Sequence, residues 1–540
     1  MDQLAADYVR VLLPVPVALP LFAAGLTLAL ARRARAQRII SVTALSIVLA
    51  VAVALLLLTD AGRGTYSIDV GGWPPLLGIP LVADRLSTLM LVVSATVTLA
   101  VLLYSLAQGV ADGEEGAPVS IYHPTYLVLS AGVSNAFLSG DLFNLYVGFE
   151  VLLAASYILL TLGGTKARIR AGTTYVMVSL LSSLIFLTAI ALIYAATGTV
   201  NMAELSIRLQ EIDPDVRMAL HLLLLVGFGI KAAVFPLSAW LPDSYPTAPA
   251  PVTAVFAGLL TKVGVYAIIR TQTLLFPGSE ANRLLMWVAL LTMVVGILGA
   301  VAQADIKRLL SFTLVSHIGY MVFGIALGSA AGLSGAIFYV AHHITIQTTL
   351  FLVTGLVERH SGSTALDKLG ALAKRAPLLA VLFFIPAMNL AGIPPFSGFL
   401  GKLGLLQAGV DQGTTTAYVL VAGSVVVSLL TLYAIAKVWN RAFWQEPPED
   451  EAAEAEQAHD AGTTGSGVAI AKQAVDVRTP LGMVAPTAVL VAVGVGITVV
   501  AGPLFGISDR AATDLIDRAP YVQTVLDGGD GTNASREVTR

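Results

Sequence analysis

The chain is built from apolar runs, each about 20 residues long, that recur along almost its whole length. A run of this length crosses roughly 30 Å of hydrocarbon as a helix. Apolar positions within a run are continuous, not alternating, and this pattern favours helices over half-buried strands. The length criterion predicts about fourteen membrane spans. They lie near residues 11–30, 39–59, 84–108, 121–139, 141–162, 172–198, 215–237, 252–275, 282–303, 308–329, 332–357, 377–409, 415–440 and 482–506.

The short loops predict the orientation of these spans, because cytoplasmic loops carry an excess of Lys and Arg. The loops after the first, fifth, ninth and eleventh spans are basic, and alternating spans place all four on one side. Both termini are then predicted to lie outside the cytoplasm. The first run is longer than a signal-peptide core of about 7–15 residues, so we interpret it as a span. The basic residues are Arg32, Arg33, Arg35, Arg38, Lys166, Arg168, Arg170, Lys307, Arg308, Arg359, Lys368, Lys374 and Arg375.

Two spans are interrupted by glycine and proline. The seventh contains GIKAAVFPLSAWLP at 229–242, and the twelfth contains GIPPFSGFLGK at 392–402. Proline inside a helix frees backbone carbonyls, which membranes tolerate only where protein or water covers them. Paired interrupted helices at matching positions indicate the ion path of a transporter. Each is the fourth member of a five-span group, spans 4–8 and 9–13, and the groups enter the membrane from opposite sides. The sequence therefore predicts an all-α polytopic membrane protein with two inverted repeats.

This grouping divides the chain into five segments. They are three N-terminal spans (1–110), the first repeat (121–275), the second repeat (282–440), a linker (445–480), and a last span with its tail (482–540). The linker contains Glu446, Glu449, Asp450, Glu451, Glu454 and Glu456 and has little to bury. We expect it to be flexible and cytoplasmic.

The overall composition supports a membrane protein and narrows the function. Only 12% of the 540 residues are charged, against roughly 25% in average soluble proteins. The net charge of −3 gives no indication of nucleic-acid binding. There is no cysteine, so disulfides, thiolate metal sites and ordinary iron–sulfur clusters are excluded. No phosphate-binding lysine loop is present either. We therefore expect a transporter rather than an enzyme, without a cofactor of its own.

Three lysines, Lys231, Lys262 and Lys402, lie inside apolar spans. Together they cost roughly 8–10 kcal/mol on insertion scales, which indicates a use. Burial disfavours the ammonium form of an amine, so a buried lysine can load and release a proton. Glu150 is the acid deep in a span, and we predict that it switches Lys231. Purely structural alternatives are a static Glu150–Lys231 ion pair that fixes helix packing and a Lys262 side chain that extends to the membrane surface.

Histidines supply further candidates, because imidazole titrates near physiological pH. His342 and His343 lie inside the eleventh span and His317 inside the tenth. Each either relays protons or bridges helices as a satisfied polar group, and spacing does not choose between His342 and His343. His221 is roughly 15 Å along the helix from Lys231 and is interpreted as a packing or access group. Those in or beside loops, expected to be solvated, are His123, His360 and His459.

Three motifs occur in the same order in a known family. WLPDSYPTAPAPVTA at 240–254, DIKRLLSFTLVSHIGY at 305–320 and GIPPFSGFLGK at 392–402 resemble signatures of antiporter-like proteins. These comprise proton-pumping membrane subunits of respiratory complex I and large subunits of Mrp-type Na⁺/H⁺ antiporters. The resemblance covers roughly residues 80–440. GDLFNLY at 140–146 and RAPYVQTVL at 518–526 look like the D-type subunit of Mrp antiporters, and the lateral-helix extension and the extra domains of other members are absent.

The resemblance implies roles by position. Glu150 and Lys231 match the family's glutamate–lysine pair, Lys262 the central relay lysine, His342 a histidine of the eleventh helix, and Lys402 the group at the far end of the axis. One position departs from the pattern. Gln347 stands where many D-type subunits are expected to have lysine, which raises the importance of His342 and His343.

The resulting hypothesis is a proton-translocating subunit of a hetero-oligomeric Na⁺/H⁺ antiporter in a bacterial plasma membrane. Protons would pass along the lysines and histidines, driven by a membrane potential worth about 2.3 kcal/mol per charge per 100 mV. One alternative is a pump subunit of a complex I-like oxidoreductase or membrane hydrogenase. The other is a scaffold whose polar residues only pack helices. No residues are assigned to the sodium ion.

Overall fold

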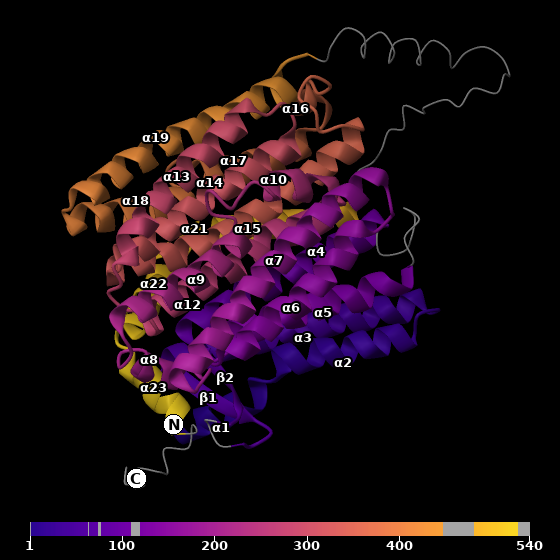
Figure 1. The fold of residues 1–540 in the computed structure, drawn as a ribbon. Coiled ribbons are helices and arrows are strands. Elements are labelled where there is room, and N and C mark those ends of the chain that lie inside the picture. Colours follow the sequence, from indigo (N-terminus) through magenta and orange to yellow (C-terminus); the bar gives the residue numbers. More distant parts are fainter. Residues whose placement is uncertain (1, 63, 74–76, 110–118, 447–479, 528–540) are drawn as a thin grey trace, which may run out of the picture.

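A computed structural model describes residues 2–62, 64–73, 77–109, 119–446 and 480–527 (Figure 1). The chain forms a bundle of long helices, with the first helix and the last one at the same end (Figure 1). The N-terminal elements are α1 (Asp2–Leu12), α2 (Val15–Ala29), α3 (Ala34–Ala61), β1 (Thr65–Val70), β2 (Ile79–Asp84) and α4 (Arg85–Gln108). The C-terminal elements are α21 (Leu481–Val499), α22 (Ala501–Ile516) and α23 (Ala519–Leu526).

Two series of helices lie between these ends. The first comprises α5 (Val119–Leu138), α6 (Leu142–Thr161), α7 (Lys166–Thr197), α8 (Met202–Arg208), α9 (Pro214–Ala232), α10 (Leu241–Ser244), η2 (Tyr245–Thr247), α11 (Ala250–Val255), η3 (Phe256–Leu260) and α12 (Thr261–Leu274). The second comprises α13 (Ala281–Ala302), α14 (Ile306–Leu327), α15 (Ala330–Ser361), α16 (Leu372–Arg375), α17 (Pro377–Ala391), α18 (Ser397–Gln412), α19 (Thr415–Val438) and η4 (Trp439–Trp444).

The predicted helical membrane fold is confirmed, but the count of fourteen spans is not. Within the described residues, eleven helices are long and apolar enough to cross a membrane. The remaining three predicted spans correspond to α5, α9, and the separate helices α17 and α18. The polar positions of α5 and α9, and the interruption between α17 and α18, explain why these three fall short of the criterion.

The helices sort into a buried centre and an outer shell with exposed apolar side chains. α14, α15 and the continuous unit from α11 to α12 are almost wholly buried, whereas α2, α3, α7 and α19 bury only about a third of their apolar stretches. Exposed Leu, Val and Ile side chains cover the outer helices. The predicted relay residues Lys262, His317, His342 and His343 therefore lie on the most deeply buried helices of the chain.

Matching contacts recur in the two series of helices. An isolated bridge joins Asp141 to Asn201 at the start of α6, and another joins Asp305 to Ala365 at the start of α14. Asp141 and Asp305 each cap the N-terminus of the helix that follows. The sequence distance from Asp141 to Asp305 equals the distance from Asn201 to Ala365. The same distance separates the first residue of the 32-residue α7 from the first residue of the 32-residue α15. These contacts support the predicted repeat, whose boundaries stay a prediction.

One small element was absent from the all-α prediction. β1 and β2 form an antiparallel hairpin with Thr65 opposite Asp84, in a stretch too short and too irregular for the periodicity to reveal. A backbone bridge from Leu81 to Ser139 and a hydrogen bond from Ser67 Oγ to the Thr524 carbonyl (2.9 Å) attach the hairpin to the residue that follows α5 and to α23. The predicted acidic linker falls mainly on 447–479, and the predicted tail extends past 527, so both predictions lie largely outside the described residues.

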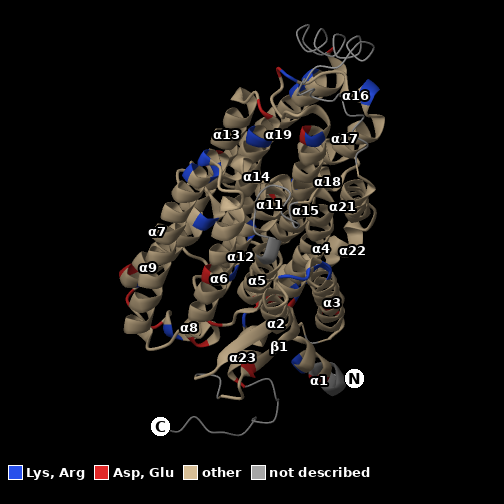
Figure 2. Cartoon of the chain, turned by 90° about the vertical axis from the view of Figure 1, so that its right-hand side faces the viewer, with Lys and Arg blue, Asp and Glu red and all other residues tan. Residues whose placement is uncertain are grey.

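Charged side chains differ between the two ends of the bundle. Lys and Arg gather near α16, whereas Asp and Glu are prominent near α8, α9 and α23 (Figure 2). The end near α16 carries the basic loops after α6 and α15, including Lys166 and Arg375. The opposite end, which carries the hairpin, α8 and α23, is called the terminal end below.

Candidate functional site

The first helix break lies directly after Lys231. α9 stops at Ala232 because Ala233 adopts a left-handed backbone (φ 59°), and the Phe235–Pro236 peptide bond that follows is cis. Trp240 Nε1 donates to the Ile230 carbonyl at 3.2 Å, so a side chain covers one of the freed carbonyls. The break therefore places a lysine at the end of a helix inside the bundle, as the sequence predicted.

Lys231 and Glu150 meet through a third side chain. Lys231 Nζ donates to Ser183 Oγ at 2.9 Å and faces the Ser179 carbonyl at 3.4 Å. Ser183 Oγ donates to Glu150 Oε1 through a short hydrogen bond. The described contacts include no direct ion pair between Glu150 and Lys231. Sequence reasoning missed Ser183, because a serine in an apolar helix carries no signal that separates it from its neighbours.

Lys262 is fully buried and does not reach a surface. Its Nζ donates to the Ala257 carbonyl at 2.6 Å. This carbonyl belongs to the π-helical turn η3, which widens the helix just before the lysine, and such turns are frequent at functional sites. The snorkelling alternative is therefore wrong for Lys262, and the wide turn supplies the acceptor for its ammonium group.

The three histidines of α14 and α15 form one cluster around Tyr339. His317 Nδ1 lies 2.8 Å from the Tyr339 hydroxyl. The ring centroid of His317 is 5.1 Å from that of His343, and the ring centroid of His342 is 5.3 Å from that of Tyr339. All four side chains are buried. The structure thus brings together all three predicted histidines and adds a tyrosine that the sequence did not single out.

The second helix break holds Lys402 and connects it to the histidines. α17 ends where Gly392 adopts φ 82°, and α18 begins at Ser397. Lys402 Nζ donates to the Ala391 carbonyl (3.0 Å), the Leu390 carbonyl (3.3 Å) and Ser428 Oγ (3.0 Å). His342 Nδ1 lies 3.0 Å from Ser397 Oγ. One end of the histidine cluster therefore contacts the break that positions Lys402.

Several buried polar atoms in this central region have no hydrogen-bond partner among the residues that the structure describes. Buried polar groups are normally bonded, and buried waters commonly bond polar groups that protein atoms leave without a partner. Gln347 is an example: its Nε2 donates to the Leu310 carbonyl at 2.7 Å, but its Oε1 has no partner among the described residues. The others in this region are Thr261 Oγ1, His317 Nε2, His342 Nε2, both ring nitrogens of His343, and Asn389 Nδ2.

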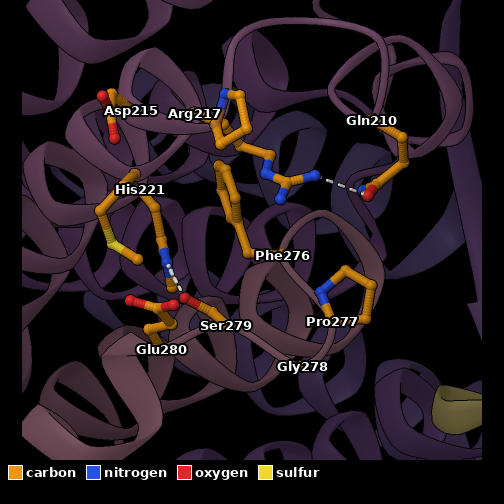
Figure 3. Close-up of a pocket in the computed structure, with 11 residues that line it drawn as sticks. Gln210, Asp215, Arg217, His221, Phe276, Pro277, Gly278, Ser279 and Glu280 are labelled. Atoms are coloured by element: carbon orange, nitrogen blue, oxygen red, sulfur yellow. Dashed lines mark hydrogen bonds between the residues drawn. The ribbon is translucent and has the colours of Figure 1, made fainter.

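Other candidates lie apart from this line. His221 forms part of the wall of a cavity of about 310 Å³ at the terminal end (Figure 3). His123 was expected to be solvated, but it is fully buried in α5, and its Nδ1 lies 2.9 Å from Ser41 Oγ of α3. His360 lies in the last turn of α15 and is partly exposed, whereas His459 lies outside the described residues. No group of three or more His, Asp or Glu residues that could hold a metal ion occurs in the described parts of the chain.

Comparisons with known proteins agree with this architecture. Residues 139–431 match the family described as "NADH:quinone oxidoreductase/Mrp antiporter, TM". The D-type subunit of the Na(+)/H(+) antiporter of Alkalihalophilus pseudofirmus is 40% identical over 86% of this chain and 89% of its own length. A chain of the Mrp complex from Dietzia sp. DQ12-45-1b is 38% identical, with a TM-score of 0.84 over 95% of this chain and 99% of that one. A chain of the archaeal membrane-bound sulfane sulfur reductase is 26% identical, with a TM-score of 0.82 over 96% and 100%.

Proposed function

We propose that this chain is the proton-translocating subunit of a multisubunit Na⁺/H⁺ antiporter. The chain belongs to the NADH:quinone oxidoreductase/Mrp antiporter membrane family. Its relative in A. pseudofirmus is named as the D-type subunit of a Na(+)/H(+) antiporter, and its structural neighbour is part of an Mrp complex. The partners are then the other subunits of that complex, and the transported ions of the assembly are protons and Na⁺.

The proposed proton route follows the buried polar side chains from one helix break to the other. Lys231 takes up a proton under the control of Glu150, and Lys262 receives it. The His343, His317 and Tyr339 side chains carry it across the centre, and His342 passes it to the break that holds Lys402. The observation that carries this proposal is the burial of all three lysines, each hydrogen-bonded to a backbone carbonyl. Lys231 and Lys402 lie beside the two helix breaks, and Lys262 lies just after the π turn η3.

A lysine held this way can change its charge without leaving its place. A carbonyl oxygen accepts a hydrogen bond from either an ammonium or a neutral amine. The desolvation cost of the ammonium is set by what surrounds it. A change in a nearby charge therefore shifts the proton affinity of the lysine while the geometry stays fixed. This is the property required of a relay station.

The proposed setting is a bacterial plasma membrane with both termini outside the cytoplasm. The basic loops near α16 support this orientation, since Lys and Arg concentrate on the cytoplasmic side. Protons entering down the membrane potential gain about 2.3 kcal/mol per charge per 100 mV, and this energy would drive Na⁺ out through the complex.

The test measures collapse of a pH gradient on Na⁺ addition in everted vesicles that contain the whole complex. We expect Lys231→Ala, Glu150→Ala and Lys402→Ala to abolish exchange, while Lys166→Ala, at an exposed position in the first turn of α7, leaves it unchanged. Wild-type exchange in the first three variants, with the complex assembled, would refute the relay. Purification of the native complex with flavin and iron–sulfur subunits instead of antiporter subunits would assign the chain to a redox-driven pump.

A further inference from the structure

Ser183 occupies the gap between the two charges of the first repeat. Its hydroxyl accepts a hydrogen bond from Lys231 Nζ at 2.9 Å and donates its single proton to Glu150 Oε1. The side chain is buried in α7, so bulk water does not compete for these bonds. Because Glu150 and Lys231 form no direct contact, a proton that moves between them in this geometry moves through the Ser183 hydroxyl.

We propose that Ser183 is the residue through which a proton moves between Lys231 and Glu150. As Glu150 Oε1 takes the hydroxyl proton, Ser183 Oγ takes a proton from Lys231 Nζ. The Nζ–H and Oγ–H bonds break, and new Oγ–H and Oε1–H bonds form. The serine ends unchanged, the ammonium becomes a neutral amine, the carboxylate becomes a carboxylic acid, and no other reactant is needed. The reverse transfer restores both charges. This inference rests on the proposed relay.

The second repeat lacks both partners of this bridge. The sequence shift that carries Asp141 onto Asp305 carries Ser183 onto Gln347 and Glu150 onto Leu314. Leucine cannot carry a charge, and the Gln347 amide donates to the Leu310 carbonyl instead of bridging to an amine. The amine–hydroxyl–carboxylate arrangement is therefore specific to the first repeat and does not follow from the shared helical framework.

The adjacent serine provides a matched control. Ser182 is also buried, but its hydroxyl donates to the Gly227 carbonyl at 2.8 Å and contacts neither charge. We expect Ser183→Ala to lower Na⁺-driven exchange at least tenfold, because a positioned proton donor typically contributes about 10²–10⁴-fold, and to alter the pH profile. Ser183→Thr, which keeps a hydroxyl, should recover most of the activity, and Ser182→Ala should retain the wild-type pH profile.

The outcomes separate this inference from the relay itself. If Ser183→Ala behaves like Ser182→Ala while Lys231→Ala abolishes exchange, the bridge is wrong and the relay stands. If Lys231→Ala and Glu150→Gln also keep wild-type exchange, the relay has failed. If Ser183→Thr does not recover activity although the complex assembles, the serine acts through packing and the bridge is refuted.

A second inference rests on the cavity at the terminal end. The cavity lies between the start of α9 and the loop before α13, and Figure 3 shows His221, Phe276, Ser279 and Glu280 around it. The charged groups that face it are Asp215 and Arg217 from α9 and Glu280 from the loop, and Arg217 is held by Gln210 Oε1 at 2.9 Å. His221 itself is only 1% exposed.

The hydrogen bonds of His221 suit a group that gains and loses a proton. Gln272 Nε2 donates to Asn282 Oδ1, which turns Gln272 Oε1 toward His221 Nε2 at 2.8 Å. Nε2 therefore carries a hydrogen in both charge states. Nδ1 lies 2.9 Å from Ser279 Oγ, and a hydroxyl can donate to a bare nitrogen or accept from a protonated one. Rotation of one hydroxyl accommodates both states of the ring.

We infer that His221 is a proton-loading group at the terminal mouth of the first repeat. It lies ten residues before Lys231 on α9, which corresponds to about 15 Å along the helix. The carboxylates of Asp215 and Glu280 at the cavity mouth favour an arriving proton. The aromatic ring of Phe276, stacked on His221 at 4.2 Å between centroids, fixes the orientation of the imidazole.

The test compares His221→Asn with Met218→Leu, which changes a side chain of the same cavity without a titratable group. We expect His221→Asn to remove one ionisation from the pH profile of exchange and to lower the rate severalfold, with Met218→Leu matching the wild type. An unchanged profile in His221→Asn would overturn the inference. So would an equal change in both variants, since the cavity shape rather than the imidazole would then be responsible.

Discussion

Arg270→Met in α12 tests how much the buried ion pair at the terminal end contributes to stability. α12 is the helix that also carries Lys262. Arg270 Nη2 lies 2.6 Å from Asp84 Oδ2, and both side chains are more than nine-tenths buried. The guanidinium also contacts the rings of Tyr266 and Tyr521, at 5.4 and 5.1 Å from the centroids. The pair joins the helix that carries Lys262 to the start of α4 and to the C-terminal helix α23.

The expected cost follows from the burial of the pair. At 2.6 Å and an effective dielectric constant near 20, the attraction is about 6 kcal/mol. Desolvation of the two ions costs several kcal/mol each, so the intact pair contributes little net stability. Arg270→Met leaves the Asp84 carboxylate buried without its partner, and such a loss costs roughly 3–5 kcal/mol. Asp84→Asn, made together with Arg270→Met, removes the stranded charge and keeps a good helix cap, so most of the stability should return.

The assay is thermal dissociation of the detergent-solubilised complex, followed by size-exclusion chromatography after heating. We expect a large fall in the midpoint for Arg270→Met and substantial recovery in the double variant. The control is Arg308→Met, whose ion pair with Asp243 is exposed and should contribute about 0–1 kcal/mol. A double variant as unstable as Arg270→Met alone would show that the cost came from lost packing. A loss in Arg308→Met equal to that in Arg270→Met would refute the burial argument altogether.

Two further predictions concern the relay. Gly264→Ala should lower exchange and destabilise the chain by about 1–3 kcal/mol, because the added Cβ would lie 2.7 Å from the Ala232 nitrogen at the first helix break. The control is Gly496→Ala, whose added Cβ meets no atom within 4 Å. It should be neutral in the same vesicle and heating assays. Gln347→Leu should slow proton transfer across the centre, whereas Gln347→Lys, which supplies a titratable group, should retain it in the same vesicles; equal activity in both would mean that protons bypass this position.

The sequence alone located the titratable groups well, because an ionisable side chain in a long apolar run is rare and expensive. Lys231, Lys262 and Lys402 needed no further signal, and the interrupted motifs predicted helix breaks next to two of them. The grouping of His317, His342 and His343 could be anticipated only as a shared location on neighbouring spans. Their contacts with Tyr339 and Ser397 depend on helix rotation and packing, which hydropathy does not encode.

Other features could not be predicted for different physical reasons. Ser183 is one of many serines in apolar helices, and only the packing of α7 against α6 and α9 distinguishes it from Ser182. His123 was expected to be solvated because it lies near the end of a predicted span, and its burial against Ser41 of α3 depends on helix packing that hydropathy does not encode. The β1–β2 hairpin is stabilised by contacts with distant segments, including the bond from Ser67 to α23, and these contacts leave no periodic trace in the sequence.

The two helix breaks share a framework but differ in what can change their charge. At the first break, the proton affinity of Lys231 depends on Glu150, a group that itself ionises and lies one hydroxyl away. At the second, Lys402 is held by two carbonyls and Ser428, none of which ionises, and the position equivalent to Glu150 is Leu314. In the proposed relay, the fixed dipoles around Lys402 give this lysine a single proton affinity. Lys231, by contrast, has a different proton affinity for each of the two charge states of Glu150. In the proposed relay, any variation in the proton affinity of Lys402 comes from the charge of the neighbouring histidine cluster or from an adjoining subunit, whereas Lys231 has an ionisable partner, Glu150, one hydroxyl away.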